Sequence, residues 1–172
     1  MRSVPAGRYL RFAAVAAAGS LADLATKSWV FARVPLGGEV WWLWEDYLGF
    51  QTSLNKGALF GMGQGLTWLF AGLSVVALVF ILYWLFVARA AIDRLLTLAL
   101  AMVTGGILGN LYDRLAIGGV RDWILMGVPG WKWPNYNIAD SLLVIGAALL
   151  LWHARGESKP AAEPSEAPRA EA

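Results

Sequence analysis

The sequence contains no cysteine, a single histidine and few charged side chains. The absence of cysteine among its 172 residues excludes disulfides, thiolate metal sites and cysteine nucleophiles. The one histidine, His153, lies near the end of the last apolar run, so a zinc site and a Ser-His-Asp triad are not expected. Charged residues make up 15% of the chain, against about 25% in soluble domains. The formal net charge of +2 gives no reason to expect a nucleic-acid partner.

The residues that dominate are apolar, and they fall into four long runs. Hydrophobic residues make up 58% of the chain and the mean hydropathy is +0.54, which indicates a single-domain membrane protein. A helix needs about 20 mostly apolar residues to span a bilayer. Four segments meet or approach this length: residues 12–31, 66–87, 95–112 and 138–153. We therefore expect a membrane-embedded domain over residues 1–155. Residues 156–172, rich in Ala, Pro, Glu and Ser, are expected to form a disordered cytoplasmic tail.

The first apolar run also has the features of a cleaved signal peptide. Arg2, Arg8 and Arg11 would be its basic region, and Ala-Gly-Ser-Leu-Ala its cleavage site. Asp23 and Lys27 favour a retained span instead, because residues four apart share one helix face and the apolar run continues beyond them.

Four spans place both termini on one side of the membrane. Arginines flank the spans on that side, which the positive-inside rule makes cytoplasmic, although the other side also carries some Lys and Arg. The two loops on the other side are rich in Trp and Tyr, as is typical at the level of the lipid headgroups. Within the first of them, residues 40–53 are aromatic and apolar between turn-rich stretches. The predicted fold is an all-α membrane protein with four transmembrane helices and a small β-sheet, over about 38–54, on the outer face.

Six ionisable side chains lie inside or at the edge of the predicted spans: Asp23, Lys27, Asp113, Arg114, Asp122 and Asp140. A charge near the bilayer centre costs about 2.5–3.5 kcal/mol on insertion scales, so such groups are kept for chemistry, binding or helix association. Asp122 and Asp140 are predicted near the same membrane face, which suggests a paired-carboxylate site.

Two polar motifs could contribute to such a site from the loops and the third span. Residues 55–61, NKGALFG, place the amide of Asn55 beside glycines such as Gly57 that allow close approach of a ligand. They could equally form an ordinary turn. In residues 105–114 the glycines allow close helix approach, and Asn110, Asp113 and Arg114 follow within about one turn. Helix association plus an interfacial ion pair is the alternative.

Two further motifs carry the paired acids. Asp122 lies among apolar residues in the predicted loop between the third and fourth spans, where a solvated loop acid is the alternative. Asn137 could cap the fourth helix, with Asp140 at the third helical position, where an acid favours the helix dipole. Taken together, the four motifs predict one polar pocket at the outer interface, formed by Asn55, Asn110, Arg114, Asp122, Asn137 and Asp140.

The ordered set of motifs resembles lipoprotein signal peptidase, or signal peptidase II. The matching elements are Asp23 with Lys27, Asn55-x-Gly-Ala-x-Phe, Gly109-Asn110-x-x-Asp113-Arg114, Val120-x-Asp122 and Asn137-x-Ala139-Asp140, and they extend over about residues 23–146. Each motif is weak singly, whereas their order and spacing within four spans are specific.

The resemblance implies an aspartic endopeptidase of the bacterial inner membrane that needs no metal or cofactor. Such enzymes cleave diacylglyceryl-modified prolipoproteins before the lipidated cysteine. The implied catalytic residues are Asp122 and Asp140. The implied substrate-binding residues are Asn55, Gly57, Asn110, Arg114 and Asn137, with Asp23, Lys27 and Asp113 as polar support. The expected partners are the prolipoprotein and membrane lipid, and the expected state is a monomer.

Two close carboxylates cannot both ionise easily, so one would keep a proton while the other activates water. Asp113 is expected to be ionised and paired with its neighbour Arg114. A small transporter, proton channel or assembly factor remains an alternative, because Asp23 and Lys27 would suit a polar bundle interior. The clustering of the polar residues at one interface disfavours it, and the intact aspartates disfavour a catalytically inactive homologue.

Overall fold

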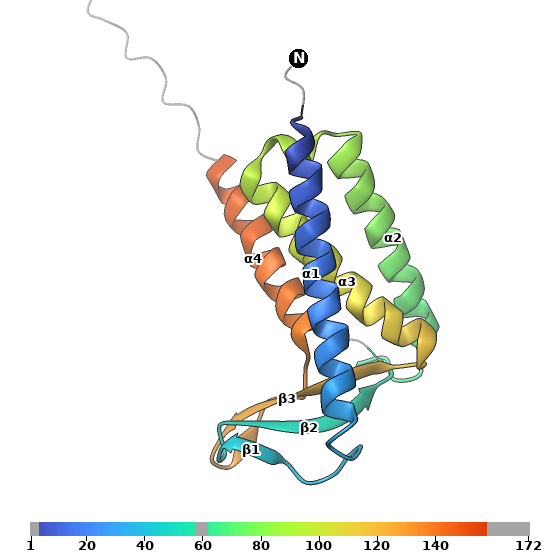
Figure 1. Cartoon of the computed structure of the whole chain (residues 1–172), viewed down its shortest axis with the longest axis vertical. Helices are drawn as coiled ribbons and strands as arrows, with labels where there is room; N and C mark the ends of the chain where they lie inside the picture. The colour runs from blue at the N-terminus through green and yellow to red at the C-terminus, as the bar shows by residue number, and fades with distance from the viewer. Residues whose placement is uncertain (1–3, 58–61, 158–172) are drawn as a thin grey trace, which may run out of the picture.

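The computed structural model describes residues 4–57 and 62–157. It contains four long helices, α1 (Ala6–Phe31), α2 (Thr67–Phe86), α3 (Arg94–Ala116) and α4 (Ile138–Glu157), with a short 3-10 helix η2 (Ala90–Ile92) between α2 and α3. The helices form one bundle (Figure 1). Residues 58–61 of the predicted glycine motif and residues 158–172 of the predicted tail lie outside the described residues, whereas Gly156 and Glu157 belong to α4.

Helix α3 is the centre of the bundle, because it packs against α1, α2 and α4. Its glycines explain how closely α3 approaches α1 and α4. A Cβ atom added to Gly105 would lie 3.0 Å from the main-chain oxygen of Ala16 in α1, and one added to Gly106 would lie 2.5 Å from that of Ala139 in α4. The prediction that these small residues permit close helix approach is confirmed.

Three of the four helices are long and apolar enough to cross a membrane: α2, α3 and residues Ile138–Arg155 of α4. The outward faces of α2 and α4 expose large apolar side chains such as Val76, Phe80 and Leu151, which suits contact with lipid. Helix α1 has 26 residues but also carries four charged side chains, Arg8, Arg11, Asp23 and Lys27.

The helix bounds differ from the predicted spans at two places that matter. Helix α1 begins at Ala6 instead of about residue 12, so Arg8 and Arg11 lie within the helix and not ahead of it. Helix α3 continues to Ala116, beyond the predicted end at about residue 112, so Asp113 and Arg114 are helical.

The sheet has four antiparallel strands in the order β1 (Trp41–Trp44), β2 (Leu48–Asn55), β3 (Val120–Val128) and β4 (Trp131–Lys132). Strands β1 and β2 agree with the sheet predicted over 38–54. The prediction of a loop between the third and fourth spans is wrong for Val120–Val128, which form strand β3. Strand β3 pairs with β2, with Ser53 opposite Asp122 and Asn55 opposite Val120, so Asp122 is held on a sheet.

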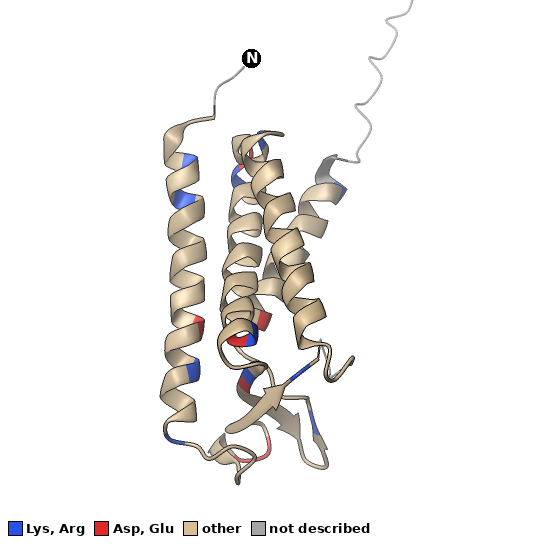
Figure 2. Ribbon diagram, turned by 90° about the vertical axis from the view of Figure 1, so that its right-hand side faces the viewer, with Lys and Arg blue, Asp and Glu red and all other residues tan. Residues whose placement is uncertain are grey.

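The sheet lies beyond the end of the bundle where α1 ends and α4 begins (Figure 1). We call this the sheet end, and the opposite end, which carries the start of α1 and the α2–α3 connection, the N-terminal end. Charged residues are concentrated towards these two ends (Figure 2). Helix α1 packs along α3, and its Asp23 and Lys27 side chains are fully buried. Removal of α1 as a signal peptide would therefore take two charged groups out of the core.

Candidate active site

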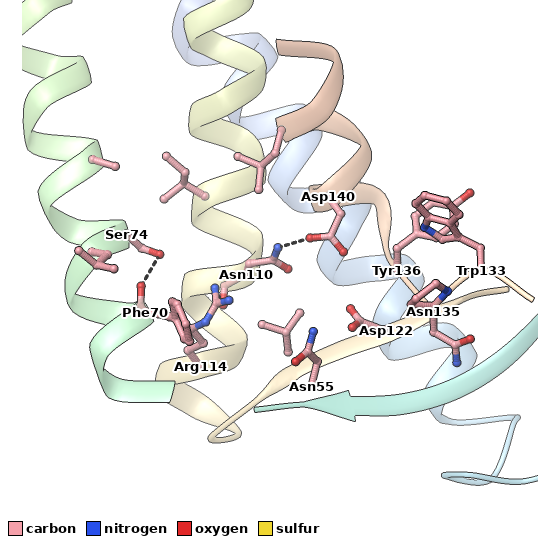
Figure 3. Close-up of a pocket in the computed structure, with 16 residues that line it drawn as sticks. Asn55, Phe70, Ser74, Asn110, Arg114, Asp122, Trp133, Asn135, Tyr136 and Asp140 are labelled. Atoms are coloured by element: carbon pink, nitrogen blue, oxygen red, sulfur yellow. Dashed lines mark hydrogen bonds between the residues drawn. The ribbon is translucent and has the colours of Figure 1, made fainter. Parts of the chain in front are cut away.

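A cavity of about 310 Å³ opens between the helices and the sheet. Five of the predicted polar residues line it: Asn55 from β2, Asn110 and Arg114 from α3, Asp122 from β3, and Asp140 from α4 (Figure 3). The sixth, Asn137, is fully buried behind the two aspartates that it contacts. The structure therefore assembles the predicted pocket from four separate stretches of chain.

Asp140 is held at the start of α4 by a reciprocal pair of hydrogen bonds. The Asn137 N–H donates to Asp140 Oδ2 at 3.1 Å, and the Asp140 N–H donates to Asn137 Oδ1 at 2.9 Å. This is a capping box, with Asn137 at the cap and Asp140 at the third helical position. The predicted structural role of this motif is thus confirmed, and the same geometry places Asp140 in the cavity wall.

Asn137 also links the two aspartates. Its side-chain amide donates to Asp122 Oδ1 at 2.7 Å, while its main chain donates to Asp140. Burial, and then the negative charge of Asp140, raise the pKa of Asp122 to about 7, against the opposing effect of hydrogen bonds from Asn137 and Asn55. The pKa of Tyr136, also at the cavity, is raised by burial. With a pKa of about 7, Asp122 can gain or lose a proton near neutral pH.

The second oxygen of Asp140 is held from α3. Asn110 Nδ2 donates to Asp140 Oδ1 at 2.8 Å, and Asn110 Oδ1 accepts from Lys27 Nζ at 2.9 Å. Because an ammonium group can only donate, Lys27 fixes the orientation of the Asn110 amide and turns its NH₂ group towards Asp140. Lys27 thus acts on Asp140 through Asn110.

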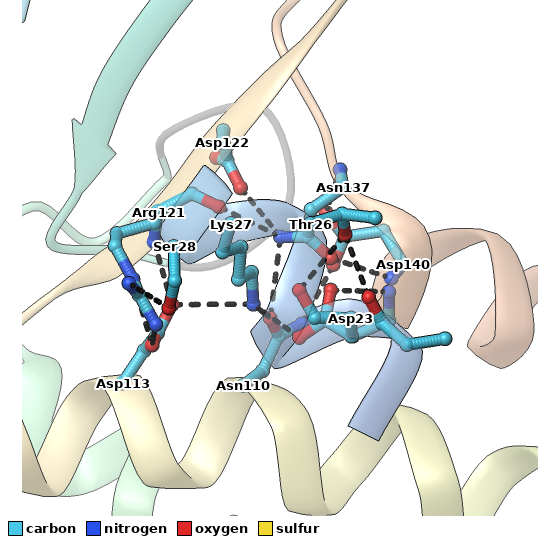
Figure 4. A network of polar contacts seen from close by, with 12 residues as sticks. Asp23, Thr26, Lys27, Ser28, Asn110, Asp113, Arg121, Asp122, Asn137 and Asp140 are labelled. Atoms are coloured by element: carbon cyan, nitrogen blue, oxygen red, sulfur yellow. Dashed lines mark hydrogen bonds and ion pairs between the residues drawn. The ribbon is translucent and has the colours of Figure 1, made fainter. Parts of the chain in front are cut away.

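Beside the cavity lies a set of four charged side chains that we call the ion cluster: the fully buried Asp23, Lys27 and Asp113, and the partly buried Arg121 (Figure 4). Lys27 Nζ is 2.7 Å from Asp23 Oδ2 and 3.2 Å from Asp113 Oδ2, and Arg121 Nη2 is 2.7 Å from Asp113 Oδ1. Two acids and two bases balance one another. The other Asp23 oxygen accepts from the Ala139 N–H at 2.9 Å, which ties the cluster to α4.

The predicted pairing of Asp113 with Arg114 is wrong. Adjacent residues on a helix do not face each other, so Asp113 points to Lys27 and Arg121 while Arg114 lines the cavity. Arg114 Nη2 donates to the Gly57 carbonyl at 3.4 Å. Its buried Nε has no hydrogen-bond partner among the described residues. The Gly57 N–H in turn donates to Asn55 Oδ1 at 2.9 Å.

The ion pair of Arg121 with Asp113 was not predicted from the sequence. Successive residues of a strand point to opposite faces, so on β3 the side chain of Asp122 lines the cavity while that of Arg121 reaches the ion cluster. Recognition of residues 120–128 as a strand would have given this signal. Tyr136 and Asn135, which also line the cavity, were likewise not predicted as part of it.

Fold and site together define a helical membrane protein with two carboxyl groups joined through one asparagine in a polar cavity. Residues 15–155 match the family model described as signal peptidase (SPase) II. The chain belongs to the signal peptidase II family, and hence to a family of membrane peptidases.

Individual relatives agree with this assignment. The chain is 48% identical over 161 residues to a lipoprotein signal peptidase of Rhodopirellula baltica, covering 86% of this chain and 72% of that protein. It is 35% identical over 150 residues to a lipoprotein signal peptidase of Polynucleobacter necessarius, covering 83% and 88% of the two chains. A solved bacterial membrane enzyme superposes with a TM-score of 0.77 at 26% identity, over 88% of this chain and 93% of that one.

Proposed function

We propose that this protein is an aspartic endopeptidase that removes the signal peptide from diacylglyceryl-modified prolipoproteins, cutting before the lipidated cysteine. Its relatives are named lipoprotein signal peptidases. The observation that carries the aspartic mechanism is the joint attachment of Asp122 and Asp140 to Asn137 at the wall of one cavity. No other pair of acids lines that cavity within the described residues.

We infer different roles for the two aspartates from their surroundings. Asp140 lies in the first turn of α4, where the helix dipole stabilises a negative charge, and both its oxygens accept N–H groups. Asp122 lies on a strand, and its pKa of about 7 keeps a proton on it up to neutral pH. Ionised Asp140 would take a proton from the attacking water, and protonated Asp122 would polarise the scissile carbonyl. Asp122 would give its proton to the carbonyl oxygen as Asp140 takes one from the water, and Asp140 would then protonate the leaving amine while Asp122 regains a proton from the collapsing intermediate, so the pair holds a single proton at each stage.

The cavity also accounts for a lipidated substrate. One side of α2 lines it with Phe70, Leu73 and Ala77, and Ile107 of α3 and Leu143 of α4 complete an apolar wall. This wall begins beside Arg114 and the paired acids and continues along the helices. The diacylglyceryl group would lie against the wall while Arg114, Asn110 and Asn55 hold the peptide backbone, which lowers the barrier by fixing the reacting groups.

We propose that the chain spans the membrane four times, with α1 crossing it in addition to α2, α3 and α4. The charged Asp23 and Lys27 of α1 are fully buried against α3, so they do not face lipid. Basic residues gather at the N-terminal end, in Arg8, Arg11, Arg94 and Arg155, which the positive-inside rule makes cytoplasmic. The exposed Trp41, Trp44 and Trp131 support a position of the sheet at the outer surface of the bacterial inner membrane. One domain over residues 1–155, acting as a monomer, supplies the whole site.

The test is cleavage of a lipidated precursor by purified protein. Asp122→Asn and Asp140→Asn should each lower turnover by about 10²–10⁴-fold, the range that acid–base groups supply, without loss of the folded state. Asp46→Asn is the matched control, since Asp46 is an exposed acid at the sheet end, away from the cavity. Near wild-type turnover in either cavity variant would exclude the aspartic pair.

A second arm compares lipidated with unlipidated precursor. Preferential cleavage of the lipidated form is expected, because only that form has acyl chains that can pack against the apolar wall. A transporter or assembly factor would cleave neither form, so this assay also decides against the other class of function.

A further inference from the structure

A second cavity lies at the N-terminal end of the bundle, far from the aspartates. It has a volume of about 240 Å³ and lies between α1 and α3. Arg11, on its wall, is 16 residues before Lys27, which corresponds to about 24 Å along the helix. This cavity is therefore no extension of the peptidase site.

The α1 side of this groove is formed by Arg8, Arg11, Phe12 and Val15. Their spacing of three, four and seven residues places them on one face of the helix. The two arginines come first and the two apolar residues follow, deeper in the bundle. The polar and apolar halves of the stripe are thus separated along the helix axis.

The α3 side repeats the same pattern with Arg94, Thr97, Leu98 and Ala101. Helices α1 and α3 both run from the N-terminal end to the sheet end (Figure 1). The polar residues of the two stripes consequently face one another at the mouth of the groove, and the apolar residues face one another further in. Such a groove matches a molecule with an anionic head and a hydrocarbon chain.

The charge at the mouth is not neutralised by the protein. None of Arg8, Arg11 and Arg94 makes an ion pair with another described residue, and the buried Nη1 of Arg8 has no hydrogen-bond partner. The nearest acid in sequence, Asp93, accepts from the Leu96 N–H and lies 3.5 Å from His153 Nε2. Three guanidinium groups with free donors are a strong site for phosphate oxygens.

We propose that this groove binds an anionic phospholipid, with its phosphate between Arg8, Arg11 and Arg94 and the start of one acyl chain over Phe12 and Leu98. A free phosphate or nucleotide would leave the apolar half of the groove uncovered, whereas a lipid fills both halves. The bound lipid would join α1 to α3 at the end opposite the ion cluster, and so stabilise the helix that carries Lys27. The proposal does not depend on the peptidase assignment.

The experiment measures lipid binding to the full chain reconstituted in phosphatidylcholine nanodiscs. Phosphatidylglycerol should bind at one saturable site and raise the Tm, because a ligand of the folded state stabilises it. Arg8→Gln/Arg11→Gln should weaken this binding at least tenfold. Arg155→Gln is the control, because Arg155 is an exposed arginine at the same end, outside the groove. It removes one positive charge and should leave binding within twofold of wild type.

Three results would overturn the proposal. They are equal binding of phosphatidylglycerol and phosphatidylcholine, equal losses in Arg155→Gln and the groove variant, and an equal Tm rise with inorganic phosphate alone. The last would indicate a phosphate site without a lipid. If the double variant does not fold, Arg94→Gln tests the groove from α3, with the same tenfold loss expected. Unchanged binding in a folded Arg94→Gln protein would also contradict the proposal.

Discussion

Two pairs of acids lie side by side at the sheet end, and they are stabilised in different ways. Asp23 and Asp113 each contact a cationic nitrogen at 2.7–3.2 Å in the ion cluster. Asp122 and Asp140 accept hydrogen bonds from the amides of Asn137 and Asn110. A cation cancels a buried negative charge, whereas an amide stabilises it without cancelling it. The comparison separates acids fixed for structure from acids whose proton can move.

Lys27 connects the two pairs. It is bonded to both acids of the ion cluster and also to Asn110, which holds Asp140. The ion cluster therefore sets the geometry of the titratable pair without sharing its proton. Each of the following predictions tests this division, from the largest expected effect to the smallest.

Replacement of the shared cation should have the largest effect. Lys27→Met leaves Asp23 and part of the charge of Asp113 buried without compensation, and the loss of one partner of a buried pair costs about 3–5 kcal/mol. We expect a large fall in the free energy of unfolding in detergent, together with loss of activity as Asn110 becomes free to turn. Lys56→Met, a change at an exposed lysine of the sheet end, should leave stability within about 0.5 kcal/mol of wild type. Equal free energies of unfolding in the two variants would show that the ion cluster does not stabilise the folded protein.

A methyl group beneath the ion cluster should have an intermediate effect. Gly109 of α3 lies directly against the Asp23 carboxylate and the Ala139 side chain, so an added Cβ would clash with Asp23 Oδ2. Gly109→Ala should destabilise the protein by about 1–3 kcal/mol, as overpacking does. Gly72→Ala on α2 is the control, since a Cβ there meets nothing within 4 Å, and better helix propensity should make it neutral or stabilising. Thermal unfolding of both variants in the same detergent makes the comparison. An unaffected Gly109→Ala protein would mean that the cluster tolerates displacement.

The pH dependence of stability should distinguish the titratable pair by a gradual change, the smallest effect at any single step of one pH unit. The pKa of Asp122 is about 7 in the folded protein against an ordinary value of 3.8. Between these values the folded state holds the extra proton, so stability is greatest at acid pH and falls as the pH rises towards 7. The contribution of one proton is about 1.4 kcal/mol per pH unit.

The measurement is the free energy of unfolding of wild type minus that of Asp122→Asn at pH 5, 6 and 7. The difference should fall with pH across this window and level off above it. A difference that is flat from pH 5 to 7 would place Asp122 among the acids whose charge is fixed.

Much of the fold could be predicted from the sequence because the apolar runs are long. The bounds of α2 and the start of α4 follow from composition alone, and Gly105 and Gly106 indicate the close packing of α3. Strand β3 could not be found in this way, because the residues of β2 that pair with it lie 65–78 residues earlier in the chain. A strand that owes its conformation to a distant partner carries little local signal.

The candidate site shows the same division. Asp122, Asp140 and their asparagines could be selected by residue type and spacing, and the structure brings them together. The partners of Asp113, Lys27 and Arg121, could not be selected in this way, since they come from another helix and from a strand that was not predicted. Sequence proximity favoured Arg114. That prediction failed because adjacent residues on a helix point in different directions.

The capping box has a consequence for how this chain can change over generations. Asp140 stabilises the start of α4 as well as facing the cavity, so its replacement would lower the stability of the folded protein even where no precursor is cleaved. Asp122 has no comparable structural duty. In a lineage in which cleavage is no longer required, we expect Asp122 to be replaced before Asp140. Asp140 would then remain in the sequence after the activity is lost.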